Sequence, residues 1–100
     1  MVIISSKFTK LGPNLLAKAR VFSLIGDKTR LRILCFMFEK KHACVSEIAE
    51  ELSLSVANIS YHLQLLKKDD FFETHRMGNE ICYELIESNL IKKLRSFICD

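Results

Sequence analysis

Two short helices followed at once by a hairpin place the strongest constraint on what this chain can fold into. Residues 46–68 contain two amphipathic stretches separated by the tight turn Ser53-Leu54-Ser55, in which Ser55 is a suitable helix cap. Directly after them, 71–76 and 80–85 are rich in aromatic or branched residues and flank Met77-Gly78-Asn79, which indicates a β-hairpin. This order is typical of a winged helix-turn-helix, although a small α+β domain of another kind could share it.

Apolar periodicity predicts three further helices. The first follows the Gly12-Pro13 breaker with Asn14 as its cap and is closed by Gly26, the second begins at the cap Asp27, and the last spans about 88–99. The third is expected to open at Ser46 with Glu47. The apolar positions are Leu15, Leu16, Ala19 and Phe22 in the first helix, Leu31, Leu34, Cys35 and Phe38 in the second, Ile48, Ala49 and Leu52 in the third, Val56, Ile59, Leu63 and Leu66 in the fourth, and Leu90, Ile91, Leu94, Phe97 and Ile98 in the last.

The expected fold class is therefore mainly α (α+β), in the order α-α-α-α-β-β-α. Residues 1–13 are expected to form a leader and 14–100 a single domain, as suits a chain of 100 residues. A hydrophobic content of 49% suggests an additional buried surface. The net charge of +3 is compatible with nucleic acid without proving it. No apolar run spans a bilayer and the first residues do not resemble a signal peptide, so no membrane partner and a cytoplasmic location are expected.

The four cysteines, Cys35, Cys44, Cys82 and Cys99, are dispersed and form no C-x-x-C pair. In the cytoplasm they are expected to be reduced. Their spacing argues against a structural zinc site or a disulfide-stapled secreted fold, and no cofactor is expected.

The fourth helix carries the candidate DNA-reading surface. Counting about 100° per residue from its apolar stripe leaves one face of small or hydrogen-bonding residues without acids. The residues of this face are Ala57, Asn58, Tyr61, Gln64 and Lys68, with Ser60 and His62 at its edges. Such a face suits the major groove, whereas a merely solvated face would carry more Glu and Lys. At the hairpin, His75 and Arg76 are candidates for contact with phosphate or the minor groove, and an ordinary solvated turn is the alternative.

Several segments resemble the ArsR/SmtB family of transcriptional regulators. They are FSLIGDKTRLRIL at 22–34, SEIAEEL at 46–52, SYHLQLL at 60–66 and YEL at 83–85, and together they cover the chain in order from about residue 15 to residue 99. The resemblance makes Ile33 a core residue beside Leu34. It also implies a homodimer built from the first and last helices, whose two recognition helices would read a palindromic operator on double-stranded DNA.

The chain departs from the family pattern at several functional positions. Val56 and Ala57 stand where Gln and Ser are common, so operator sequence cannot be carried over. The arsenic-type C-V-C pair is replaced here by Cys44-Val45-Ser46. The zinc-type site needs Asp and His along the last helix, but Glu87 and Asn89 stand at its start and no His follows, so no metal site is expected. Cys35 and Cys99 are similar in placement to the cysteines of the redox- and sulfide-responsive branch. A thiol switch is one interpretation of this pair, and inert core thiols are the other.

The sequence thus favours a DNA-binding transcriptional repressor, released by an inducer that it does not identify. Two alternatives stay open: a metal-responsive repressor of the same family, and a winged-helix module that binds protein. Catalysis is not expected, because His42, His62 and His75 show no convergent partners in the sequence.

Overall fold

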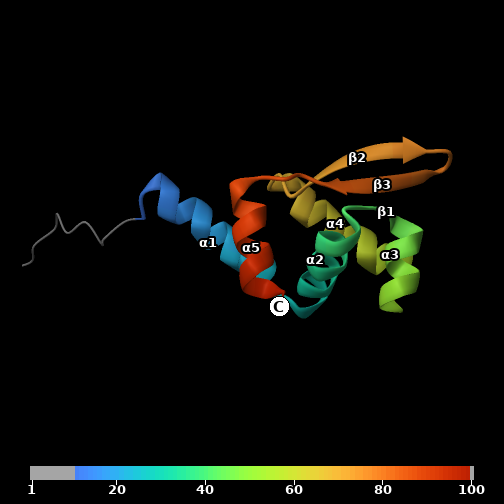
Figure 1. Ribbon diagram of the computed structural model, residues 1–100, viewed down its shortest axis with the longest axis horizontal. Coiled ribbons are helices and arrows are strands. Elements are labelled where there is room, and N and C mark those ends of the chain that lie inside the picture. Colours follow the sequence, from blue (N-terminus) through green and yellow to red (C-terminus); the bar gives the residue numbers. More distant parts are fainter. Residues whose placement is uncertain (1–10, 100) are drawn as a thin grey trace, which may run out of the picture.

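The computed structural model describes residues 11–99, which form five helices and a three-stranded antiparallel sheet (Figure 1). The elements are α1 (Pro13–Ile25), α2 (Lys28–Lys40), β1 (His42–Cys44), α3 (Val45–Leu52), α4 (Val56–Lys68), β2 (Phe72–Met77), β3 (Glu80–Leu85) and α5 (Asn89–Ile98). The mainly α (α+β) class with a hairpin wing is confirmed. Residues 1–10 of the expected leader lie outside the described part of the chain. The predicted boundary after residue 13 is one residue too late, because Pro13 is already the first residue of α1.

Side-chain caps fix three of the helix starts. The side chain of Asp27 accepts a hydrogen bond from the Arg30 amide at the start of α2. Ser55 caps α4 and Ser88 caps α5 in the same way, each through its hydroxyl oxygen. These caps satisfy amide groups that have no partner within the helix. Gly26 ends α1, as the sequence predicts.

Two predicted helix starts are wrong. Asn14 does not cap α1, since Gly12 is the N-cap and Pro13 occupies the first helical position, where its fixed φ suits a helix. Nor does α3 open at Ser46, because Cys44 is its N-cap and Val45 its first residue. The reason is tertiary: the chain enters α3 directly from the strand β1, which fixes the entry point.

The core is organised around α2, which packs against α1, α3, α4 and α5. Its residues Ile33, Leu34 and Met37 are fully buried. Leu31 and Cys35, which the periodicity assigned to the stripe, are only half-buried. A helix with neighbours on several sides buries more than one stripe, so a single 3.6-residue pattern describes it poorly.

The buried face of α4 is shorter than predicted. Ile59, Leu63 and Leu66 have no exposed surface, as expected, but Val56 is 54% exposed. Val56 is the first residue of α4 and lies on the line of the apolar stripe, but helical spacing alone does not bury it. It lines a surface pocket instead.

The sheet has the strand order β1-β3-β2, and β1 was not predicted from the sequence. His42, Ala43 and Cys44 pair with Glu84, Tyr83 and Cys82 of β3. A three-residue strand carries too few residues to show a period of two, so only its partner reveals it. At the hairpin tip Gly78 has φ +64°, which favours glycine, and Met77 belongs to β2 rather than to the turn.

A disulfide bond joins Cys44 of β1 to Cys82 of β3. The two residues lie directly opposite each other in the strand register. The expectation that all four cysteines are reduced is therefore wrong for this pair. Their separation of 38 residues hides the pairing in the sequence, because it depends on β1 docking against β3.

The terminal helices leave an apolar surface uncovered. Of the ten large hydrophobic side chains that the structure leaves exposed, six lie in residues 11–25 and α5; they are Leu11, Leu15, Leu16, Phe22, Leu90 and Phe97. In α5, Ile91 and Leu94 face the core of the same chain, so the predicted stripe is divided between two surfaces. No helix within residues 11–99 has the length and apolar character needed to cross a membrane.

A pair of substitutions in α4 tests this division between core and surface. Ile59→Ala should lower the free energy of unfolding by about 2–5 kcal/mol, because it empties a fully buried site. Val56→Ala, in the preceding turn of the same helix, should change it by less than about 0.5 kcal/mol. Urea unfolding followed by circular dichroism measures both values. Equal losses in the two variants would show that α4 is packed differently.

Candidate nucleic-acid interface

One side of α4 is open to solvent and free of acidic residues. Ala57, Asn58, Gln64 and Lys68 are exposed, Tyr61 is 60% exposed, and Ser60 is half-buried. The sequence placed these six residues on one surface, and the structure brings them together there. Asn and Gln side chains offer paired donors and acceptors, and Ala57 leaves room for close approach, so the surface has the chemistry that reads base edges.

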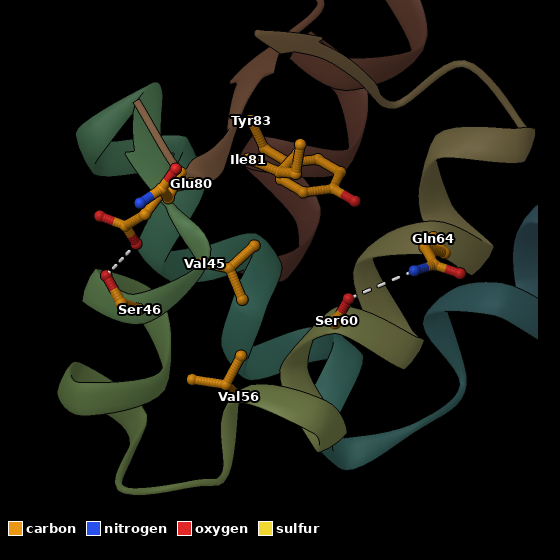
Figure 2. Close-up of a pocket in the computed structure, with 9 residues that line it drawn as sticks. Val45, Ser46, Val56, Ser60, Gln64, Glu80, Ile81 and Tyr83 are labelled. Atoms are coloured by element: carbon orange, nitrogen blue, oxygen red, sulfur yellow. Dashed lines mark hydrogen bonds between the residues drawn. The ribbon is translucent and has the colours of Figure 1, made fainter. Parts of the chain in front are cut away.

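A pocket of about 270 Å³ separates α4 from the wing (Figure 2). Val56, Ser60 and Gln64 form its wall on α4, and they follow one another at intervals of four residues, so they lie along one line of the helix. Opposite them, Ile81 and Tyr83 project from β3. Sequence reasoning missed this pocket, and only the spacing of the three α4 residues could have indicated one wall of it.

Two hydrogen bonds order the polar residues around the pocket. Ser60 accepts from the Gln64 amide at 3.2 Å, which holds that side chain along α4 (Figure 2). Ser46 of α3 donates to the carboxylate of Glu80 at the start of β3. The wing is therefore tied to the start of α3 as well as to β1. The buried ring of Tyr83 closes the inner side of the pocket, and burial raises the pKa of its hydroxyl.

The two candidate wing residues point to opposite faces of the hairpin. Arg76 lies opposite Ile81 in the register, on the face that borders the pocket and α4. His75 lies opposite Cys82 on the outer face, where its Nε2 donates to the Glu84 carboxylate at 2.7 Å. Arg76 thus lies on the same face of the hairpin as Ile81, which lines the pocket, whereas His75 is engaged on the other side of the wing.

The outer face of the wing also holds the closest set of metal-ligating atoms among residues 11–99. The ligand atoms of Glu73, His75 and Glu84 lie within 4.8 Å of one another, and all three side chains are exposed. The hydrogen bond between His75 and Glu84 already pairs two of the three groups. We assign no ion to this cluster.

A polar cluster connects the start of α2 to α4. Arg30 of α2 donates from its Nε to the Leu24 carbonyl and from a terminal nitrogen to His62 Nδ1 at 2.9 Å. Because Arg30 can only donate, the His62 nitrogen accepts. The hydrogen bond from the Arg30 amide holds the pKa of Asp27 below its usual value of 3.8, so the Asp27 carboxylate is charged at neutral pH. The stability that this cap gives to the fold is therefore lost only as the pH falls through the lowered pKa.

A second contact orients the C-terminal end of α4. Arg20 of α1 forms a 2.7 Å ion pair with Asp69, the residue that ends α4. This pairing takes up one of the two acidic charges that follow Lys67 and Lys68 in the sequence. The exposed ammonium groups of the two lysines therefore keep a positive end on α4.

The sequence singled out Cys35 and Cys99 as a pair, and the structure brings them together. Their sulfur atoms lie 2.7 Å apart, although 64 residues separate them along the chain. Cys35 lies in the middle of α2, and Cys99 directly follows α5. Burial, and then the neighbouring Cys99, raises the pKa of Cys35 to about 11.

With this geometry in place, comparisons with known proteins identify the family. A model of the arsR family of bacterial regulatory proteins matches residues 27–73. A regulator of the HTH type from Methanocaldococcus jannaschii is 33% identical over 72 residues, which are 72% of this chain and 81% of that protein. The transcriptional repressor SdpR of Bacillus subtilis is 37% identical over 65 residues, 65% of this chain and 71% of the repressor.

The solved structure of HlyU from Vibrio cholerae has the same fold. It superposes with a TM-score of 0.76 at 24% identity, covering 90% of this chain and 100% of that one. The chain belongs to the arsR family of bacterial regulatory proteins, and it is a transcriptional regulator rather than an enzyme.

Proposed function

We propose that this regulator binds a palindromic operator as a homodimer, represses transcription in the cytoplasm, and is released from DNA by oxidation of Cys35 and Cys99. The observation that carries the DNA-binding part is the exposed, acid-free surface of α4, which a pocket separates from the wing that carries Arg76. α4 would enter the major groove, and the wing would contact the neighbouring backbone.

The division of labour follows from the chemistry of each element. Asn58, Tyr61 and Gln64 offer hydrogen bonds and a flat ring, which distinguish bases. Arg76 and Lys68 carry positive charges suited to phosphate, which fix position without reading sequence. His75 was a candidate for the same role, but its bond to Glu84 on the outer face makes it the weaker one. We therefore assign it no primary contact.

The exposed apolar surface of the terminal helices supports a homodimer. Phe22 of α1 is 66% exposed and Phe97 of α5 is 79% exposed. Between the two helices lies a hollow of about 190 Å³ lined by Val21, Phe22, Leu90 and Leu94 together with Lys18. A second copy of the same surface would cover both phenylalanines, and a two-fold axis through α1 and α5 would place the two wings at the far ends of the dimer (Figure 1).

The sulfur contact supports a thiol-based signal. Cys35 lies on the central helix, and Cys99 lies at the end of a helix in the proposed dimer surface. A hydroperoxide or a persulfide could link the two sulfurs without large movement, because they already lie 2.7 Å apart. The link would tie α5 to α2 and so bias the relative position of the two subunits.

A protein-binding winged helix is the rival function, and one observation favours it. Val56 and Tyr61 expose large apolar surfaces on α4, as a protein-binding surface would. The salt dependence of duplex binding separates the two functions, since only phosphate contacts release counterions. Binding to duplex DNA that does not weaken between 50 and 200 mM salt would favour the rival.

Two substitutions test the roles of α4 and the wing. Tyr61→Ala should alter the preference for operator over unrelated DNA, whereas Arg76→Ala should weaken binding to all sequences and reduce the salt slope by about one. Lys92→Ala, an exposed cation on α5, is the matched control and should leave both quantities unchanged. Fluorescence anisotropy over a salt series measures them. Wild-type binding by both test variants would show that the DNA surface lies elsewhere.

Phe97→Glu tests the homodimer. Because Phe97 is 79% exposed, the substitution should leave the fold intact and yield monomers that bind operator DNA at least about tenfold more weakly. Leu94 is a poorer choice, since it is buried within its own chain. Lys92→Glu places the same charge on the other flank of α5 and should remain dimeric. Sedimentation at micromolar concentration decides the matter, and a monomeric wild type would contradict the proposal.

Oxidation tests the thiol signal. Treatment with hydrogen peroxide or a persulfide should produce a Cys35–Cys99 link, detected by peptide mass mapping, and lower operator affinity by about 5–150-fold, the usual range of allosteric coupling. Cys35→Ser should hold DNA under the same treatment. If this variant is still released, the pair is not the switch.

A further inference from the structure

The second cysteine pair has a chemical setting unlike that of the first. Cys44 and Cys82 are bonded across β1 and β3, on the outer face of the sheet and not on the core face that carries Ala43 and Tyr83. Cys82 has no exposed surface, whereas Cys44 is half-buried. In the reduced protein, a small molecule from solvent would therefore reach Cys44 before Cys82.

Cys44 occupies a position that favours an anionic sulfur. It is the N-cap of α3, a helix of eight residues, and its side chain makes no cap hydrogen bond there while it is bonded to Cys82. The first amide groups of a helix have no partner within the helix, and the helix dipole is positive at this end. Thiolates at helix N-termini are stabilised for the same reason, which makes such cysteines reactive.

Cys35 and Cys99 have no comparable stabilisation of a thiolate. Burial and the neighbouring sulfur raise the pKa of Cys35 to about 11, so little of it is thiolate at neutral pH. Cys99 follows the last residue of α5, and so lies at the carbonyl end of a helix. That end presents acceptors, not donors, to a sulfur atom. Cys44 and Cys99 therefore lie at opposite kinds of helix end, Cys44 at the amide end of α3 and Cys99 at the carbonyl end of α5.

We propose that Cys44 and Cys82 form a reversible oxidation site for small hydroperoxides, and that this site reacts before Cys35 and Cys99. Cys44 is the attacking thiol and Cys82 the resolving thiol. This inference does not rest on the proposed dimer or on the Cys35–Cys99 signal. The half-buried sulfur of Cys44 restricts the oxidant to a small molecule.

The reaction has two steps. The Cys44 thiolate attacks one peroxide oxygen, the O–O bond breaks, and the leaving oxygen takes up the proton that the thiol lost on ionising. The products are a sulfenic acid and an alcohol, or water when hydrogen peroxide is the oxidant. The Cys82 thiol then attacks the sulfenic sulfur, the S–S bond forms, the S–O bond breaks, and water leaves with the thiol proton. Overall, two thiols lose two electrons and two protons while one hydroperoxide is reduced.

The product would change how firmly the wing is held. β1 has only three residues, and it joins the start of α3 to the central strand β3 of the sheet. A bond between Cys44 and Cys82 makes this short pairing covalent and closes a loop that contains α3, α4 and β2. In the reduced form, the wing is held to β1 by ladder hydrogen bonds and to α3 by the contact between Ser46 and Glu80.

The order of reaction is measured on the fully reduced, full-length chain. The protein is exposed to substoichiometric hydrogen peroxide, quenched with an alkylating agent at intervals, digested, and mapped by mass spectrometry. The Cys44–Cys82 peptide should accumulate at least about tenfold faster than the Cys35–Cys99 peptide, because the attacking thiolate is more abundant. Cys35→Ser should form the first link at the wild-type rate. Faster formation of Cys35–Cys99, or no Cys44–Cys82 link, would overturn the proposal.

Two further variants assign the roles within the pair. In Cys82→Ser, Cys44 should accumulate as a sulfenic acid that dimedone traps, whereas in Cys44→Ser the buried Cys82 should remain a thiol. The opposite labelling pattern would reverse the assignment. Hydrogen exchange of the wild type, oxidised against reduced, should show slower exchange in residues 42–44 and 80–85. Equal exchange in the two forms would show that the bond does not restrain the wing.

Discussion

Burial of α2 is the constraint on which the rest of this molecule depends. Ile33, Leu34 and Met37 have no exposed surface, and four other helices pack around the element that carries them. A chain of 100 residues buries a smaller fraction of its surface than a larger domain does. One helix that is buried on several sides therefore supplies much of the buried apolar surface that a second layer supplies in a larger domain. Each surrounding helix keeps an outer face for another purpose.

The same helix also sets the position of α4. The buried side chains of Ile59, Leu63 and Leu66 anchor α4 to the core. Because apolar contacts have no preferred direction, they restrain the rotation of α4 about its own axis less than they restrain its position against the core. Arg30 restrains this rotation, because it donates hydrogen bonds both to the Leu24 carbonyl near the end of α1 and to the ring of His62 on α4. A rotation of α4 would break this bond. The surface carrying Tyr61 and Gln64 is thereby presented beside the wing.

The surface divides into regions with different chemistry. Apolar side chains left exposed at α1 and α5 form one region, and the hydrogen-bonding surface of α4 with the wing forms the other. The β2–β3 hairpin extends toward the end of the molecule away from α1, and α4 runs between the two regions (Figure 1). The two cysteine pairs follow this division. Cys35 and Cys99 join α2 to the end of α5, while Cys44 and Cys82 join β1 to β3 in the wing sheet.

The sequence by itself determined the features that depend on neighbouring residues. The caps Asp27 and Ser55, the turn at Gly78 and the acid-free surface of α4 follow from local chemistry and periodicity, and so the element order was predictable except for β1. Tertiary structure decided what depends on partners distant in the chain. It formed β1 by pairing it with β3, exposed Val56, turned His75 away from Arg76 and matched Cys44 to Cys82 across 38 residues, because burial and strand pairing are properties of the assembled elements. The family resemblance had singled out Cys35 and Cys99, but only the tertiary structure brings their sulfur atoms into contact.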